Sequence, residues 1–198
     1  MVERRRIGIL NQIHLPRLVY LVSAVALMDY TLYIWHALVH RLPFLWRFHE
    51  VHHADLDMDM TTSNRFHFGE LAISILWRAM QVCVIGINPL ALRIWQSILT
   101  LSIVFHHANI RIPGSLDEKL SRFIVTPKLH EVHHSVLVHQ TNSNFSSGLT
   151  LWDRLHGTYR AHPNQATVIG NPRCLSVDQV GLTQMLALPF ESRAGCNQ

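Results

Sequence analysis

Charged side chains are few in this sequence, and acidic ones are the scarcer kind. Only 15% of the 198 residues are charged, 13 of them Asp or Glu, whereas 48% are hydrophobic. The formal net charge is +4, and beyond residues 4–6 the arginines are spread singly, without a basic helix or the alternation of basic and aromatic residues that follows a phosphate backbone. We therefore expect no nucleic-acid partner, and anionic lipid headgroups account better for the basic residues.

Cysteine is also scarce. The three cysteines, Cys83, Cys174 and Cys196, have no short-range pairing, so we expect neither a disulfide framework nor a zinc ribbon. A removable leader is not indicated, because the apolar run after Arg17 continues into Asp29 and offers no small-residue cleavage site.

Long apolar stretches hold most of the hydrophobic residues. They cover residues 18–39, 71–87 and 90–105, and the last two contain Arg78 and Arg93. A helix that crosses a bilayer needs about 20 apolar residues, and each stretch is close to that length. We predict an all-α, integral membrane helical bundle; the alternative is a soluble bundle with buried helices.

The second and third stretches are joined by a turn signal, Asn88-Pro89, and we predict a membrane hairpin. A hairpin returns the chain to the side it left, so histidines before and after it face the same side. Basic residues accompany these histidine segments, and the positive-inside bias then predicts a multi-pass protein with a cytoplasmic histidine cap. The membrane would be a bacterial inner membrane or the endoplasmic reticulum.

Three arginines at residues 4–6 disagree with this orientation if the first helix crosses the membrane once. A helix missing upstream, an N-terminal segment along the membrane surface, or a first helix that does not cross would each explain them. We favour the missing helix, which makes the domain N-terminally short.

The pentapeptide HEVHH occurs twice, at residues 49–53 and 130–134, in a chain with 15 histidines. On a helix, positions i, i+3 and i+4 lie on one face, so each copy can present three imidazoles to a common point. Imidazole nitrogens in such number indicate bound metal.

Further histidines lie near these copies along the chain. One metal takes four to six ligands, so the set fits two metals with open positions better than one. The candidate ligands are His36, His40, His49, His52, His53, His67, His106, His107, His130, His133 and His134. Asp29 and Tyr33 lie on the same helical stripe as His36 and His40 and could orient the rings of these two histidines.

A carboxylate-bridged di-iron bundle is an alternative, because Glu50 with His53 and Glu131 with His134 match Glu-x-x-His. That architecture needs two more glutamates from other helices, and only Glu70 lies near a histidine segment. We expect Glu50 and Glu131 to lie outside the metal ligands.

Residues 29–159 carry, in order, the segments HALVH, HEVHH, NRFHFGE, FHHAN, TPKLHEVHHS and NFSSGLTLWDRLHGTY. This ordered combination resembles the fatty acid hydroxylase and sterol desaturase superfamily of integral membrane di-iron oxygenases. The resemblance implies a helical membrane domain, two Fe ions, O2 as co-substrate and electrons from outside the chain.

The resemblance also assigns residues. Eight histidines match the family's three boxes: His36, His40, His49, His52, His53, His130, His133 and His134. His106 stands where the family has an additional ligand. His67 and His107 would be either further metal ligands or residues that surround the ligands. Gln140, Ser146 and His156 depart from the family pattern outside the boxes.

Residues 1–162 are thus predicted to form a membrane di-iron domain, and 163–198 a C-terminal tail without identifiable chemistry. A fused haem domain is absent from the sequence, so the electron donor would be a separate protein, such as a ferredoxin or a b-type cytochrome with its reductase. The expected activity is hydroxylation or desaturation of a lipid, either a sterol or a fatty acyl compound. A non-enzymatic histidine-rich membrane protein that binds or transports metal, and a truncated inactive relative, are the alternatives.

Overall fold

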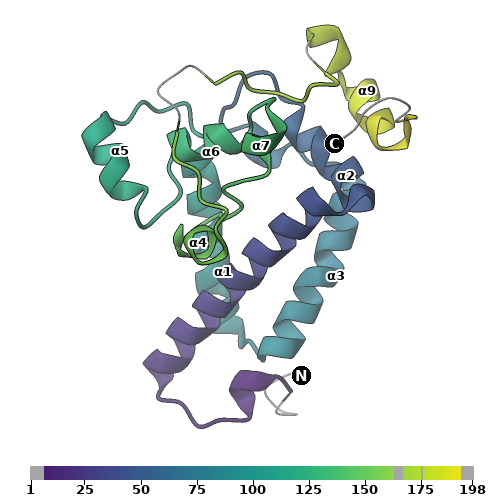
Figure 1. Ribbon diagram of the computed structural model, residues 1–198. Coiled ribbons are helices and arrows are strands. Elements are labelled where there is room, and N and C mark those ends of the chain that lie inside the picture. Colours follow the sequence, from purple (N-terminus) through teal and green to yellow (C-terminus); the bar gives the residue numbers. More distant parts are fainter. Residues whose placement is uncertain (1–6, 163–166, 175, 193–198) are drawn as a thin grey trace.

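The computed structural model describes residues 7–162, 167–174 and 176–192. Three long helices, α1 (Arg17–Arg41), α3 (Phe68–Ile85) and α4 (Pro89–His107), form a bundle, and short helices gather at one of its ends (Figure 1). The described residues contain isolated β-bridges but no strand. The structure confirms the predicted all-α bundle with a histidine-rich cap.

The remaining elements are short. They are η1 (Ile9–Asn11), α2 (Pro43–His53), η2 (Thr62–Asn64), α5 (Gly114–Leu120), α6 (Pro127–His133), α7 (Val138–Thr141), α8 (Leu151–His156), η3 (Val177–Gln179), α9 (Leu182–Ala187) and η4 (Leu188–Phe190). We call the end of the bundle that carries α2 and α5–α9 the cap.

The chain turns sharply between α1 and α2. Leu42 has extended backbone angles, φ −97° and ψ 114°, because the following proline disfavours the helical conformation before it. Pro43 then occupies the first turn of α2, where a missing N–H costs nothing. This turn places the first HEVHH copy beside the C-terminal end of α1.

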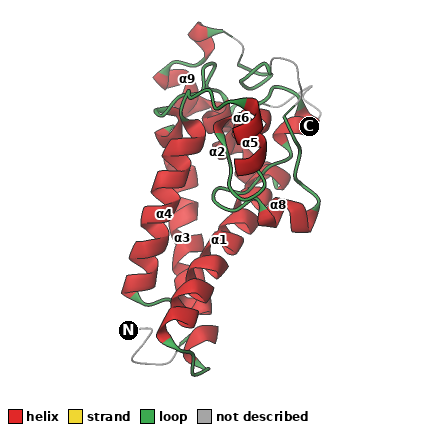
Figure 2. Cartoon of the chain, turned by 90° about the vertical axis from the view of Figure 1, so that its left-hand side faces the viewer, coloured by secondary structure: helices red, strands yellow, loops and turns green. Residues whose placement is uncertain are grey.

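The predicted hairpin is formed by α3 and α4, which lie beside α1 (Figure 2). Gly86 ends α3 in the left-handed conformation, with φ 85°. The Asn88 side chain caps α4 by accepting a hydrogen bond from the Ala91 N–H, and the Tyr20 hydroxyl donates to the Gly86 carbonyl. The turn therefore lies at the end of the bundle opposite the cap, and both HEVHH copies lie at the cap end, as predicted.

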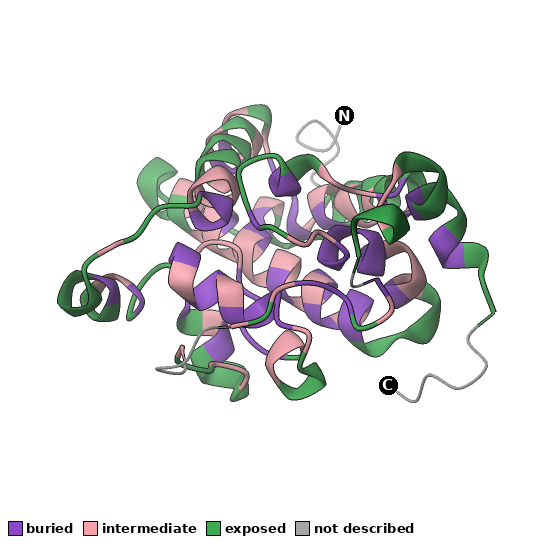
Figure 3. Ribbon diagram, turned by 90° about the horizontal axis from the view of Figure 1, so that it is seen from above, coloured by how far each residue is buried: buried purple, intermediate pink, exposed green. Residues whose placement is uncertain are grey.

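Two helices in the described residues, α1 and α3, are long and apolar enough to cross a membrane. Large apolar side chains on the outside of the bundle are exposed, and Leu18, Leu76 and Leu101 each show 71–72% of their surface. Seen from above, buried residues lie where the elements meet, and exposed residues cover the peripheral segments (Figure 3). This apolar exterior is expected of a bundle surrounded by lipid.

The bundle has an apolar core near the α3–α4 turn, at the end opposite the cap. Ala24 and Met28 of α1 are fully buried against Ala91 and Trp95 of α4 and Ile85 of α3. Small alanines let the helix backbones approach closely, and Trp95 fills the space between them. This core fixes the three helices relative to one another below the cap.

The described part of the C-terminal tail packs on α2. Cys174, Met185 and Leu188 form an apolar cluster with Val51 and Ala54. This tail segment therefore covers the helix that carries the first HEVHH copy.

Candidate metal centre

Histidines from four helices converge where the bundle meets the cap. The end of α1 supplies His36 and His40, α2 supplies His49, His52 and His53, α4 ends with His106 and His107, and α6 with its C-cap residue supplies His130, His133 and His134. All are buried except His36, which is half-buried. Burying so many polar rings without a strong partner would be costly, which points to a ligand.

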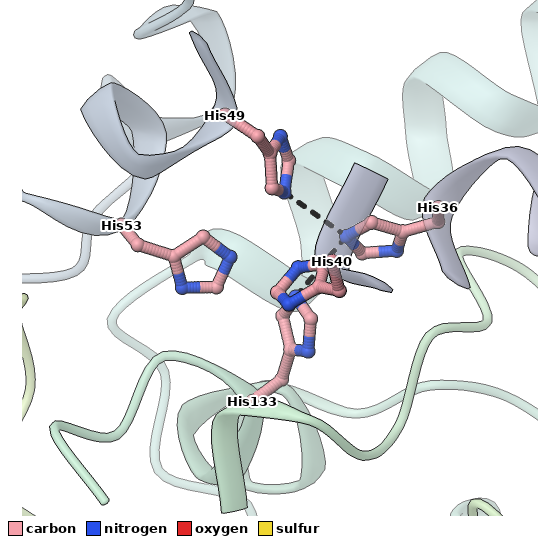
Figure 4. A group of neighbouring side chains, drawn as sticks. All are labelled: His36, His40, His49, His53 and His133. Carbon is pink, nitrogen blue, oxygen red and sulfur yellow. Dashed lines mark hydrogen bonds between the residues drawn. The ribbon is translucent and has the colours of Figure 1, made fainter. Parts of the chain in front are cut away.

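The first group contains His36, His40, His49, His53 and His133, each with one nitrogen within 4.8 Å of those of the others (Figure 4). The Nε2 atom of His36 lies 3.3 Å from Nε2 of His49 and 3.1 Å from Nε2 of His133. Two nitrogens about 2.1 Å from one ion, at tetrahedral or octahedral angles, are about 3.0–3.4 Å apart. The spacing fits nitrogens that share an ion.

The second group contains His52, His107, His130 and His134. Nε2 of His107 lies 3.3 Å from Nε2 of His52 and 3.1 Å from Nε2 of His130, which is 3.2 Å from Nε2 of His134. These distances again fit a shared ion.

Each HEVHH copy is divided between the two groups. His49 and His53 join the first group and His52 the second, whereas His130 and His134 join the second and His133 the first. The expectation that each copy presents three rings to one point is wrong. The i and i+4 rings stay together, but the i+3 ring lies on the flank of the stripe and reaches the other group.

Two candidate histidines lie outside both groups. His106 packs its ring on His130, with 4.1 Å between ring centroids. His67 caps α3, where its Nδ1 accepts a hydrogen bond from the Gly69 N–H, and its ring packs against Phe48 and Phe68. The structure thus brings nine of the eleven candidates into two groups.

Several rings are oriented by hydrogen bonds from the nitrogen that faces away from the group. Nδ1 of His36 donates to the Phe145 carbonyl at 2.7 Å, and Nδ1 of His133 donates to the Ser143 carbonyl at 2.8 Å. Because a carbonyl only accepts, each ring must carry its proton on Nδ1, which leaves Nε2 free to bind metal.

His49 is oriented by a carboxylate. Its Nδ1 donates to Oε1 of Glu70 at 2.8 Å, and both side chains are buried. The segment NRFHFGE contains this glutamate, so the sequence did place it near a histidine box. Its role as a hydrogen-bond acceptor, however, depends on how α3 meets α2.

Asp29 and Tyr33 do not orient the histidine rings, contrary to expectation. The Asp29 carboxylate accepts hydrogen bonds from Trp152 Nε1 at 2.7 Å and from the Leu149 N–H at 3.3 Å. The Tyr33 hydroxyl pairs with Thr158 Oγ1 at 3.0 Å. These hydrogen bonds join α1 to the segment around α8, so both side chains are directed away from the two histidine groups.

The two HEVHH glutamates have different surroundings. Glu50 is fully buried, and Arg173 Nη1 lies 3.1 Å from its Oε1. Glu131 is partly exposed, 3.6 Å from Nε2 of His162. Neither glutamate belongs to a histidine group, as expected.

Burial keeps His53, His133 and His134 neutral. Desolvation lowers the pKa of His53, His133 and His134 well below the usual value for histidine, and neighbouring imidazoles lower it further. Both ring nitrogens of His40 and of His53 are buried without a hydrogen-bond partner. Neutral imidazoles with unsatisfied nitrogens are ready metal ligands, and their number and arrangement fit two ions.

A cavity of about 200 Å³ extends from the histidines into the bundle. Grouped histidines from all four helices form one part of its wall, and apolar side chains such as Trp35, Val39, Leu99 and Ile103 form much of the rest. A largely apolar space that ends on the histidine groups suits a hydrocarbon chain.

Residues 21–158 match the sequence model of a family described as fatty acid hydroxylase. The chain belongs to this family. Relatives include the ornithine lipid hydroxylase OlsE of Rhizobium tropici, 32% identical over 91% of this chain and 53% of the relative, and the cholesterol 25-hydroxylase of Mus musculus, 30% identical over 75% and 50%. The alkylglycerol monooxygenase of Homo sapiens is 29% identical over 75% of this chain and 32% of its own length.

The chain spans about half the length of the first two of these family members. No solved structure shows a significant match to it. The family match confirms the resemblance derived from the histidine boxes, and these relatives are all named as lipid hydroxylases or monooxygenases.

Proposed function

We propose that this chain is the catalytic part of a membrane-bound lipid hydroxylase that holds two iron ions. The observation that carries the proposal is the pair of histidine groups at the end of an apolar cavity. The names of the relatives support hydroxylation over desaturation. Hydroxylation converts C–H, O2, two electrons and two protons into C–OH and water, and the electrons would come from a separate donor protein.

The first ion would be held by His36, His40, His49, His53 and His133, and the second by His52, His107, His130 and His134. Imidazole suits iron, zinc, copper and nickel alike, and iron is chosen here because of the family. Bound iron supplies the activation of O2, which no side chain can perform. His106, whose ring is tilted against that of His130, and His67, at the start of α3, would lie around the two ions without binding them.

The protein's own contribution is to place and shield the substrate. Carbonyls of Ser143 and Phe145 and the carboxylate of Glu70 hold three rings in fixed orientations. The apolar cavity wall excludes water and aligns the C–H bond to be oxidised. A lipid would enter laterally from the bilayer, between the long helices.

We place the cap on the cytoplasmic side, with the hairpin inserted in the membrane. Arg41, Arg47 and Arg65 lie at the cap end, whereas the turn around residues 86–88 carries no basic residue, in line with the positive-inside bias. Labelling of single cysteines introduced at residue 128 and at residue 89, an exposed position at the start of α4, would test the orientation, since a membrane-impermeant reagent should reach only the second in intact cells.

The test of function uses protein purified in detergent after expression with iron. About two irons per chain are expected, with O2-dependent formation of a hydroxylated lipid when reductant is supplied. His133→Ala should lose about one of the two irons and all product, whereas His139→Ala, at an exposed position outside both groups, should retain both irons and the activity. Full metal content in His133→Ala would refute the site, and metal release or flux without O2 consumption would favour a metal carrier instead.

A further inference from the structure

Arg78 is a half-buried positive charge in the apolar helix α3, on the side that lines the cavity. Its side chain lines the same cavity as the grouped histidines, and Ser74 and Glu70, four and eight residues earlier, line it too. These three positions form one helical stripe that runs from the metal groups into the cavity. The rise of a helix puts the Arg78 backbone about 12 Å from that of Glu70.

The guanidinium of Arg78 lacks an anionic partner. Its Nη1 atom is buried without a hydrogen-bond partner, and none of the ion pairs or hydrogen bonds among the described residues involves this side chain. Its Cζ lies 4.1 Å from the centre of the Trp95 ring, and Trp95 is 2% exposed. Contact with a ring face stabilises a cation by less than the cost of desolvating its charge. The site is therefore electrostatically incomplete.

The geometry of the guanidinium indicates which anionic group would pair with it. A guanidinium presents a planar fork of donors that matches the two oxygens of a carboxylate or phosphate. Stacking on the buried Trp95 fixes the plane of that fork. Ionisable groups inside membrane segments are costly, and those that occur mostly serve function.

We propose that Arg78 binds the acidic group of the lipid substrate, a carboxylate or a phosphate, and so sets which lipids enter the cavity and which carbon reaches the metal groups. This inference rests on the proposed function for its statement about the reacting carbon. The oxidised carbon would lie within about 12 Å of the acidic group, the length set by the helical stripe. A neutral lipid of equal chain length would leave the guanidinium unpaired and would bind more weakly.

Binding can be measured without turnover, by native mass spectrometry of the iron-loaded protein in neutral detergent. The probes are two equimolar pairs: palmitate against hexadecanol, and dipalmitoyl phosphatidic acid against dipalmitoylglycerol. We expect at least tenfold preferential retention of the acidic member in one pair. Preference in the palmitate pair identifies a carboxylate as the ligand, and preference in the phosphatidic acid pair identifies a phosphate.

Arg78→Met keeps an unbranched stem against Trp95 and removes the charge, so the preference should fall below about twofold. Arg93→Gln is the matched control, because it removes a charge from an exposed position on α4 that lies outside the cavity, and it should keep the preference. If Arg78→Met loses its iron, Arg78→Gln replaces it with the same expectation. Equal retention of acidic and neutral probes by the unaltered protein, or an unchanged preference in an iron-containing Arg78 variant, would overturn the proposal.

The two proposals fail in different ways. Acid preference without iron or O2-dependent product would leave the Arg78 site standing and refute the hydroxylase. Iron and hydroxylated product without acid preference would do the reverse.

Discussion

Nδ1 of His49 donates a 2.8 Å hydrogen bond to Oε1 of Glu70, which joins α2 to the start of α3. Among the described residues it is the one hydrogen bond between a grouped histidine and a carboxylate. A carboxylate that accepts the outer N–H of a ligating ring fixes the ring's tautomer and makes it a stronger ligand. The α3–α4 hairpin thus reaches the first histidine group through Glu70.

Replacing Glu70 should therefore weaken metal binding. Glu70→Ala removes the acceptor, and we expect a 10–100-fold loss of affinity for one of the two ions, the usual effect of losing such a partner. Glu70→Gln still accepts the hydrogen bond and should lose less. Iron retained after titration with a chelator measures the effect, with Glu118→Ala, at an exposed position, as control. Equal retention in Glu70→Ala and the control would contradict this role.

The division of the HEVHH copies makes a second prediction. His134→Ala removes a ligand from the second group and His40→Ala one from the first. Each should reduce the iron content from about two to about one per chain, because the other group keeps its full set. Metal analysis of the purified variants tests this. Loss of both ions from each variant would show instead that the two groups bind metal only together.

The helices and their order could be predicted from local sequence signals. Apolar runs marked α1, α3 and α4, and the Asn88-Pro89 pair marked the turn of the hairpin. The presence of a histidine centre followed from residue type and helical spacing. Which histidines share a group did not, because His52 and His53 are adjacent in sequence yet belong to different groups. That division depends on the tertiary placement of α2 against α4 and α6.

Contacts between segments far apart in the chain could not be predicted from the sequence either. Asp29 and Tyr33 have the right helical spacing to reach the histidines, but they form hydrogen bonds with Trp152 and Thr158 instead. The C-terminal tail shows no strong periodicity. Its contact with α2 includes the ion pair of Arg173 with Glu50, which lies more than a hundred residues earlier.

The pair of Arg173 and Glu50 should stabilise the fold. The Glu50 side chain is 1% exposed, so Arg173→Met would remove the cation from a buried carboxylate, whose Oε2 also lies 3.4 Å from Asn171 Nδ2. Breaking a buried pair from one side costs about 3–5 kcal/mol, and we expect a clearly lower thermal unfolding temperature in detergent. Glu191→Gln, which alters a contact of the same arginine at a side chain 52% exposed, should have little effect.

A double variant separates charge from packing at this position. Glu50→Gln together with Arg173→Met removes both charges and should recover part of the lost stability, because no buried carboxylate remains. If the double variant is no more stable than Arg173→Met, the arginine acts mainly through packing.

Stability of the metal-free protein should depend on pH. Burial lowers the pKa of His53, His133 and His134 in the folded state, whereas in the unfolded chain a histidine has a pKa of about 6.5. Below that pH the unfolded chain binds protons that the folded chain does not, so the free energy of unfolding falls as the pH falls. Above about pH 7 the same histidines are neutral in both states and contribute no pH dependence.

Thermal unfolding of chelator-treated protein in detergent should therefore give a constant midpoint between pH 8 and 7 and a falling one from about pH 6.5 downward. Each buried histidine contributes a slope of up to about 1.4 kcal/mol per pH unit. His134→Gln removes one such group and should flatten the slope, whereas His139→Gln, at an exposed position, should leave it unchanged. A midpoint that stays constant down to pH 5 would mean that these histidines take up protons in the folded, metal-free state, and hence that the centre opens when its metal is removed.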